Sequence, residues 1–169
     1  GGKTIRALSV GRGHTDGALV VAQLVASEAL VIRVAARKLE ALRDLTDWEV
    51  DRLLTLARET RLHAGAVLTT QGERVTAESA TAWFVIAGEV RVQRHGDDGA
   101  LVANVTLGAG ALIGVIALVL DTPRAATIVA ESDARFLAID RTAFDRMYDA
   151  DSRLAIKFRM IVARQLARD

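Results

Sequence analysis

From Arg61 to Ile139 the chain consists of short runs of β-branched and other apolar residues, separated by glycines and charged turns. Short strands at regular spacing, with turn signals between them, are typical of a β-sandwich or barrel. The stretch Gly96-Asp97-Asp98-Gly99 joins two alternating runs and predicts a hairpin turn. The runs that we expect to form strands are Ala66–Thr69, Trp83–Ile86, Glu89–Gln93, Leu101–Leu107, Thr127–Ala130 and Arg135–Ile139.

Helical patterns precede these strands. Residues from Ala18 to about Leu42 are strong helix formers without glycine or proline. Thr46 followed by Glu49 is a capping box, in which each side chain accepts a hydrogen bond from the other residue's backbone N–H, so a second helix begins there. Apolar residues recur at helical spacing after this box, and we expect the helix to end at Thr60.

Two more helices are expected after the strands. Asp140 or Thr142 can cap a short helical turn, and a final helix begins at Ser152 with one mostly apolar face. The predicted fold class is therefore mainly β, with N-terminal helices and two C-terminal helices flanking the strands. We divide the chain into a loop and helical arm (1–40), for which a tether and a dimerisation element are both open roles, and a β domain (41–169).

The composition excludes several classes of function. The 169 residues carry a net charge of +1, which gives no electrostatic case for binding nucleic acid or a membrane surface. The lack of cysteine excludes disulfides, thiolate nucleophiles and cysteine-ligated metals, and it fits a cytoplasmic location. Apolar runs are too short or too interrupted to span a bilayer. His63 and His95 have no spaced partner for a metal, and no nucleophile stands beside a base, so we expect neither a metal site nor an enzyme.

The segment from Leu107 to Thr127 has the features of an anion site. Gly110 and Gly114 permit tight turns and close approach of the backbone. The residues after Gly114 can form one helical turn whose free N–H groups point at an anion. Arg124, directly after the only proline, is a lone cation in an apolar run, and its fork of N–H donors suits a phosphate. The alternative is that Arg124 is an exposed residue of a turn.

Three motifs in order resemble the cyclic nucleotide-binding domain, over roughly residues 40–168. The resemblance implies a jelly-roll-like β-roll, also called a double-stranded β-helix. It also implies a regulatory domain that senses a ligand and acts on an attached or partner effector domain, rather than a catalyst. The motifs are Ala64-Gly65-Ala66-Val67-Leu68 with Gln71-Gly72-Glu73, the hairpin Trp83-Phe84-Val85-Ile86-Ala87-Gly88-Glu89-Val90-Arg91-Val92, and the phosphate-binding cassette Leu107–Thr127.

The resemblance also implies ligand contacts by position. Arg124 would pair with the cyclic phosphate, helped by the backbone N–H groups of Ile116 and Ala117. Ala125 stands where the family can carry a hydroxyl that helps to select cGMP, so the implied ligand is cAMP rather than cGMP. The strand near Leu101–Ala103 would flank the base, and the final helix would act as a lid over it. No cofactor is implied.

One residue departs from the family pattern. The family has an acidic residue directly after the glycine that corresponds to Gly114, where it accepts the ribose hydroxyl, and this chain has Val115 there. A hydrogen bond to a charged group contributes about 1.5–3 kcal/mol, so its loss lowers the affinity roughly 10- to 150-fold. Three hypotheses follow: the domain has lost its ligand, it binds another and more apolar small anion, or it keeps weak nucleotide binding. The rival to a sensor is a ligand-free scaffold whose apolar arm, Ala18–Ile32, pairs two copies into a homodimer.

Overall fold

The computed structural model describes residue 30 and residues 32–150 and 152–168. Residues Ala36–Asp169 form one compact unit. Most of the predicted N-terminal arm, including the stretch Ala18–Ile32 expected to pair two copies, lies outside the described residues. Its roles therefore stay predictions.

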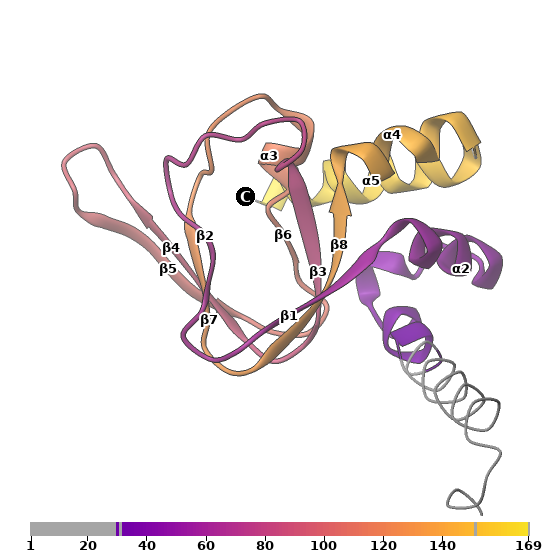
Figure 1. The fold of residues 1–169 in the computed structure, drawn as a ribbon, viewed down its shortest axis with the longest axis horizontal. Coiled ribbons are helices and arrows are strands. Elements are labelled where there is room, and N and C mark those ends of the chain that lie inside the picture. Colours follow the sequence, from indigo (N-terminus) through magenta and orange to yellow (C-terminus); the bar gives the residue numbers. More distant parts are fainter. Residues whose placement is uncertain (1–29, 31, 151, 169) are drawn as a thin grey trace, which may run out of the picture. The chain divides into compact units, whose positions relative to one another are not determined.

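The order of elements in the compact unit is helices, strands, one short helix, strands and two helices (Figure 1). This is the predicted fold class, mainly β with helices at both ends, and it is confirmed. The elements are η2 (Glu40–Leu42), α2 (Asp47–Leu56), β1 (Arg58–Leu62), β2 (Val67–Thr69), β3 (Thr81–Ala87), β4 (Val90–His95), β5 (Leu101–Leu107), β6 (Leu112–Ile113), α3 (Val115–Val119), β7 (Thr127–Ala130), β8 (Ala134–Asp140), α4 (Arg141–Ala150) and α5 (Ser152–Arg168).

The strands form two antiparallel sheets, one in the order β1-β8-β3-β6 and the other in the order β2-β7-β4-β5. Apart from the β4–β5 hairpin, neighbouring strands are not consecutive in sequence, so the chain winds back and forth as a roll. In Figure 1 the helices α2, α4 and α5 lie on the side of the first sheet, and the β4–β5 hairpin projects on the other side. The hairpin turn predicted at Gly96–Gly99 is confirmed by hydrogen bonds from Gly99 N to Gly96 O and from Gly96 N to Ala100 O.

Strand β3 is covered on both faces because alternate residues of a strand point to opposite sides. Trp83 and Val85 belong to the apolar cluster inside the roll. Phe84 faces the helices and packs edge-on against Phe158 of α5, with ring centroids 6.4 Å apart. One strand thus separates the interior of the roll from the helical layer.

Most predicted strands are confirmed within one or two residues, but two predicted boundaries are wrong. The second helix ends at Leu56, and Thr60 lies in β1, where it pairs with Phe136 of β8. The sequence did not predict β1 because its residues are mostly charged. In the fold these charges are paired across strands, with Glu59 2.7 Å from Arg135 of β8. The helix expected to reach Leu42 stops at residue 37, because buried Leu39 adopts an extended backbone before η2.

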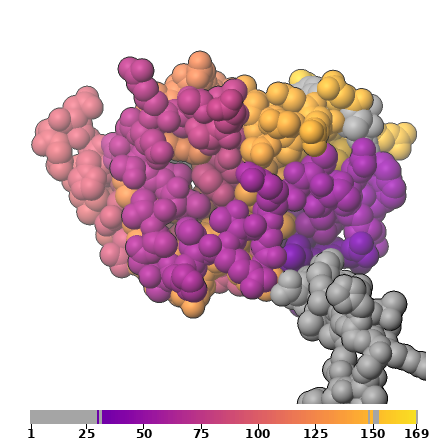
Figure 2. Space-filling model, in the orientation of Figure 1, coloured from indigo at the N-terminus to yellow at the C-terminus, as the bar shows by residue number. Residues whose placement is uncertain are grey.

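The capping box at the start of α2 is confirmed, and its glutamate also ties α2 to the last helix. Glu49 Oε2 accepts hydrogen bonds from Thr46 N at 2.8 Å and from Lys157 Nζ at 2.7 Å. Lys157 Nζ also donates to Asp44 O at 3.0 Å, and Arg164 pairs with Asp44 Oδ2 at 2.7 Å. The segment before α2 and the helix α5 are therefore joined by a polar seam, and Figure 2 shows the violet residues around α2 beside the yellow C-terminal helices.

The polar seam predicts that the stability of the fold depends on pH. Burial by itself would raise the pKa of the Glu49 carboxyl, but the bonds from Lys157 and Thr46 outweigh it and lower the pKa below 4.5. A carboxyl with a lowered folded-state pKa stabilises the fold above its unfolded pKa and loses that contribution as the pH falls through the folded one. We expect Glu49→Gln to reduce the free energy of unfolding by about 1–3 kcal/mol at pH 7, measured by urea denaturation. In this variant the free energy of unfolding should also fall less steeply than in the wild type as the pH drops below 4.5.

The matched control is Glu40→Gln, because Glu40 forms an exposed pair with Arg43 whose loss should change stability little. Equal effects of the two variants would contradict the prediction.

Candidate functional site

The turn between β6 and α3 requires a glycine. Gly114 has φ +76°, a left-handed conformation that side chains with a Cβ rarely adopt. A Cβ built on Gly114 would lie 2.8 Å from the ring of Trp83 and 3.0 Å from Thr81 O. The backbone at the start of α3 therefore lies directly against β3, which the predicted tight turn at Gly114 allows.

The Arg124 side chain reaches this turn and is 7% exposed. Its Nη1 donates to the carbonyl oxygens of Thr81 at 3.0 Å and Gly114 at 3.5 Å, and its Nη2 donates to Ser79 O at 2.9 Å. Its guanidinium carbon lies 5.0 Å from the ring centroid of Trp83, which is within range of a cation–π contact. The alternative that Arg124 is an exposed turn residue is wrong.

The backbone of Arg124 is also fixed. Its N–H donates to Glu73 O at 2.9 Å, and its carbonyl accepts from Gly72 N at 2.8 Å. Side chain and backbone together join three separate pieces of chain: the loop before β3, the start of β3 and the turn before α3. The arginine is thus held in place before any ligand arrives.

Arg124 forms no ion pair within the described part of the chain. Its three acceptors are neutral carbonyls, and among the described residues no carboxylate lies within 4.0 Å of the guanidinium. Burial lowers the pKa of Arg124, and the field of Glu73 opposes that effect in part. A buried cation without a counter-ion is unfavourable, so the arrangement favours an anion beside it.

The other predicted site residues lie close by in the chain. Val115 and Ala117 are buried in α3, Ile116 is partly buried, and Ala125 is exposed next to Arg124. The N–H groups of the first turn of a helix have no partner within that helix, so those of Ile116 and Ala117 are of the kind that binds anions. The structure brings Gly114 and Arg124 into contact, whereas the ligand contacts of all six residues, Gly114, Val115, Ile116, Ala117, Arg124 and Ala125, stay predictions.

Sequence reasoning missed three groups that hold the arginine: the ring of Trp83 and the carbonyls of Ser79 and Thr81. They lie more than 40 residues before Arg124, as the separations of 43 and 45 residues in its hydrogen bonds show. No spacing rule links such positions. A lone buried arginine needs acceptors, and that requirement was the only available signal.

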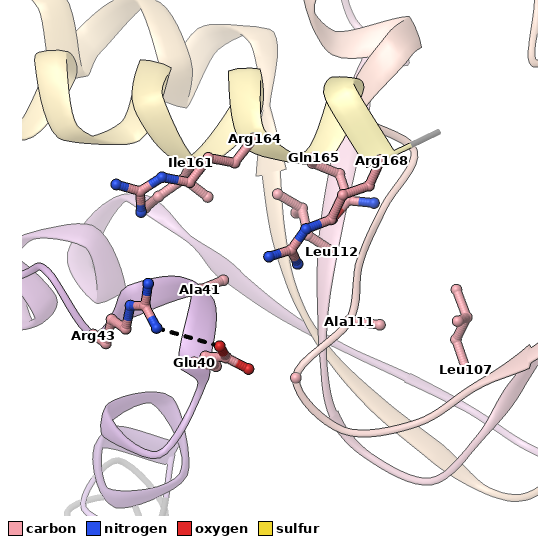
Figure 3. Close-up of a pocket in the computed structure, with 11 residues that line it drawn as sticks. Glu40, Ala41, Arg43, Leu107, Ala111, Leu112, Ile161, Arg164, Gln165 and Arg168 are labelled. Carbon is pink, nitrogen blue, oxygen red and sulfur yellow. Dashed lines mark hydrogen bonds and ion pairs between the residues drawn. The ribbon is translucent and has the colours of Figure 1, made fainter.

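A pocket of about 270 Å³ lies on the helical side of the first sheet (Figure 3). Leu112 lines it, whereas its neighbour Ile113 faces the interior of the roll with Trp83, so the pocket and Arg124 lie on opposite faces of β6. The pocket is thus separate from the predicted ligand site. Its lining consists of Glu40, Ala41, Arg43, Leu107, Gly110, Ala111, Leu112, Ile161, Arg164, Gln165 and Arg168.

Metal sites and membrane-spanning helices are both absent from the described residues. They contain no group of three or more His, Cys, Asp or Glu side chains that could hold a metal ion. Within the same part of the chain, no helix is both long and apolar enough to cross a membrane.

Comparisons with known proteins identify the family and the fold. Residues 59–151 match a family model described as "Cyclic nucleotide-binding domain". Rap guanine nucleotide exchange factor 3 of Mus musculus is 42% identical over 86 residues, which make up 50% of this chain but only 8% of that protein. The structure of a cyclic nucleotide-binding domain from Methylobacillus flagellatus has a TM-score of 0.71 at 21% identity and covers 84% of this chain and 78% of its own. The regulatory domain of Toxoplasma gondii PKA, crystallised with cAMP, has a TM-score of 0.67 at 17% identity, over 84% of this chain and 52% of its own. The two structures share the fold.

The contacts of Arg124 predict that this residue stabilises the fold without any ligand. Arg124→Ala leaves the carbonyls of Thr81 and Ser79 without their donor in a mostly buried site. We expect the free energy of unfolding in nucleotide-free buffer to fall by about 1–3 kcal/mol, measured by urea denaturation. Arg74→Ala, at an exposed arginine of the loop between β2 and β3, is the control and should have little effect. A ligand-free Arg124→Ala protein as stable as the wild type would refute the structural role.

Proposed function

Because this chain belongs to the cyclic nucleotide-binding domain family, we propose that it is a regulatory domain that senses a cyclic nucleotide with reduced affinity. Domains of this family are regulatory sensors and not catalysts, and we propose the same for this chain. The ligand that we assign is cAMP rather than cGMP, since Ala125 offers no hydroxyl to a guanine base. The cAMP in the Toxoplasma structure shows that the same fold accommodates this nucleotide in a relative.

The observation that carries the proposal is the buried charge of Arg124. Carbonyl dipoles orient the guanidinium without cancelling its charge, and Glu73 acts on it only through its field and not through an ion pair. A cyclic phosphate has a single negative charge, so one phosphate beside Arg124 would balance the site. Its remaining oxygens would face the N–H groups of Ile116 and Ala117 at the start of α3.

Val115 sets the expected strength of binding. Its side chain is 2% exposed and offers no acceptor to a ribose hydroxyl. A nucleotide bound here would leave that hydroxyl without its partner in a closed site. Weak binding of cAMP, or preference for an anion without a ribose, follows from this single side chain.

The signal would pass from the cassette to the helices. Helix α3 packs against both β3 and α5, so a ligand that moves α3 also disturbs the last helix. We propose that α5 acts as the lid and conveys ligand occupancy to an effector domain, attached or separate, in the cytoplasm. The chain matches only a small part of its curated relative, so the effector is not assigned.

A ligand-free scaffold is the second candidate. The same contacts that orient Arg124 also satisfy several of its donors, and Val115 is packed among neighbours rather than left open. A domain that has lost its ligand would keep both features. A sensor gains thermal stability by mass action when its ligand is added, whereas a scaffold does not.

Titration calorimetry with cAMP and cGMP tests both candidates. We expect cAMP to bind more weakly than low-micromolar, to raise the Tm of the domain, and to bind roughly 10- to 150-fold more tightly to Val115→Glu, which restores an acceptor for the ribose hydroxyl. Val115→Gln is the matched control for shape, since it adds a neutral acceptor and should recover only part of the gain.

Other results would reject the proposal. Low-micromolar binding by the wild type would refute the role of Val115. Absence of binding and of any Tm shift in both the wild type and folded Val115→Glu would favour the scaffold instead.

A further inference from the structure

A groove of about 350 Å³ lies between α3, α4 and α5, outside the predicted ligand site. Its walls are mostly apolar and come from all three helices, with charged groups from α4 and α5. Two arginines and one aspartate give the lining a net positive charge. The lining residues are Leu118, Val119, Arg141, Phe144, Asp145, Arg159, Val162, Ala163 and Leu166. We call this surface the α3–α5 groove.

The guanidinium of Arg141 has no partner in the groove. Its side chain makes no hydrogen bond or ion pair with any described residue, and its Nε is enclosed by protein. The backbone of Arg141 is anchored, since its N–H donates to Ala80 O at 2.9 Å. The side chain as a whole is partly exposed, so a carboxylate that enters the groove can pair with the outer nitrogens of this guanidinium.

The apolar surface continues beyond the groove. Ile156 and Met160 of α5 are 59% and 52% exposed, and Ala163, which lines the groove, lies one turn further along the same helix. Residues 156, 160 and 163 have the spacing of one helical face. Exposed apolar surface that extends past a pocket is typical of a protein-binding site rather than of a site for a small molecule.

We propose that the α3–α5 groove binds an apolar helical segment of an effector protein, and that a carboxylate on this segment pairs with the guanidinium of Arg141. The unpaired cation of Arg141 favours an acidic segment. A second copy of α5 is a poor occupant, because residues 152–168 contain five basic residues and no acidic one. A carboxylate next to apolar side chains at helical spacing fits both the apolar walls and the guanidinium of Arg141.

This surface goes beyond the nucleotide site, although it has a wall in common with the cassette. Leu118 and Val119 belong to α3, the helix that follows Gly114. An effector seated in the groove would therefore touch the element that a ligand at Arg124 is expected to move. Peptide binding to the groove is measured on nucleotide-free protein, so the result does not depend on whether cAMP binds.

A phage-displayed peptide library, selected on the wild-type chain and counter-selected on Leu166→Glu, tests the proposal. Leu166→Glu places a negative charge on the wall of the groove at a position that is already 36% exposed, so the fold should persist. We expect enriched peptides with apolar residues at helical spacing and a glutamate or aspartate on the same face. The best peptide should bind Leu166→Glu about tenfold more weakly in fluorescence anisotropy, and it should bind Val105→Glu, a similarly exposed apolar position on β5, as well as the wild type.

A double-mutant cycle then tests the role of Arg141. Replacing the acidic residue of the peptide by its amide should weaken binding to the wild type about tenfold, and should make no difference to Arg141→Gln, which lacks the cation. No enrichment over the counter-selection, or equal binding of acid and amide peptides to the wild type, would overturn the proposal. Two other results would assign the groove to a different occupant and would also overturn the proposal. One is a dimer in sedimentation velocity that Leu166→Glu abolishes. The other is binding to phosphatidylserine vesicles without binding to any peptide.

Discussion

The buried guanidinium of Arg124 is the constraint on which the rest of the site depends. It donates to carbonyls of the loop before β3, of the first residue of β3 and of the turn before α3, and it lies over the ring of Trp83. Carbonyls and an aromatic face orient a cation without cancelling its charge. The same contacts that hold the loops together therefore leave a fixed positive charge inside the roll, which is what recognition of a phosphate needs.

The approach of Gly114 to Trp83 explains why the cassette is so compact. A side chain at position 114 would collide with the indole ring, so α3 starts directly against β3. The next residue, Val115, is then enclosed by protein. An acidic residue there would offer an acceptor to a bound sugar, whereas valine offers only apolar surface. On the proposed function, this one side chain lowers the affinity for a ribose-containing ligand without changing the fold.

Strand β3 connects the site to the helices. Trp83 faces the interior and contacts Arg124, while the adjacent Phe84 packs on Phe158 of α5. Helix α5 is held from its other side by Glu49, through Lys157. Helix α5 is thus bound to the sheet by packing and to the N-terminal segment by an ion pair. The contacts of α5 with the sheet and with the N-terminal segment are the ones that a ligand-driven shift of α3 would have to change.

The sequence by itself determined the local structure: the strand runs, the hairpin turn at Gly96–Gly99, the capping box at Thr46 and Glu49, and the helical turn after Gly114. Each of these depends on residues a few positions apart, and the backbone preferences of such residues act within the segment itself. The tertiary structure alone decided that Arg58–Leu62 is a strand, because its partner β8 lies more than 70 residues further along the chain. It also decided the surroundings of Arg124, where Trp83 and two carbonyls from before and within β3 complete the site. Those contacts arise from how the sheets wind, and no periodicity along one segment records which distant backbone oxygen a buried cation will meet.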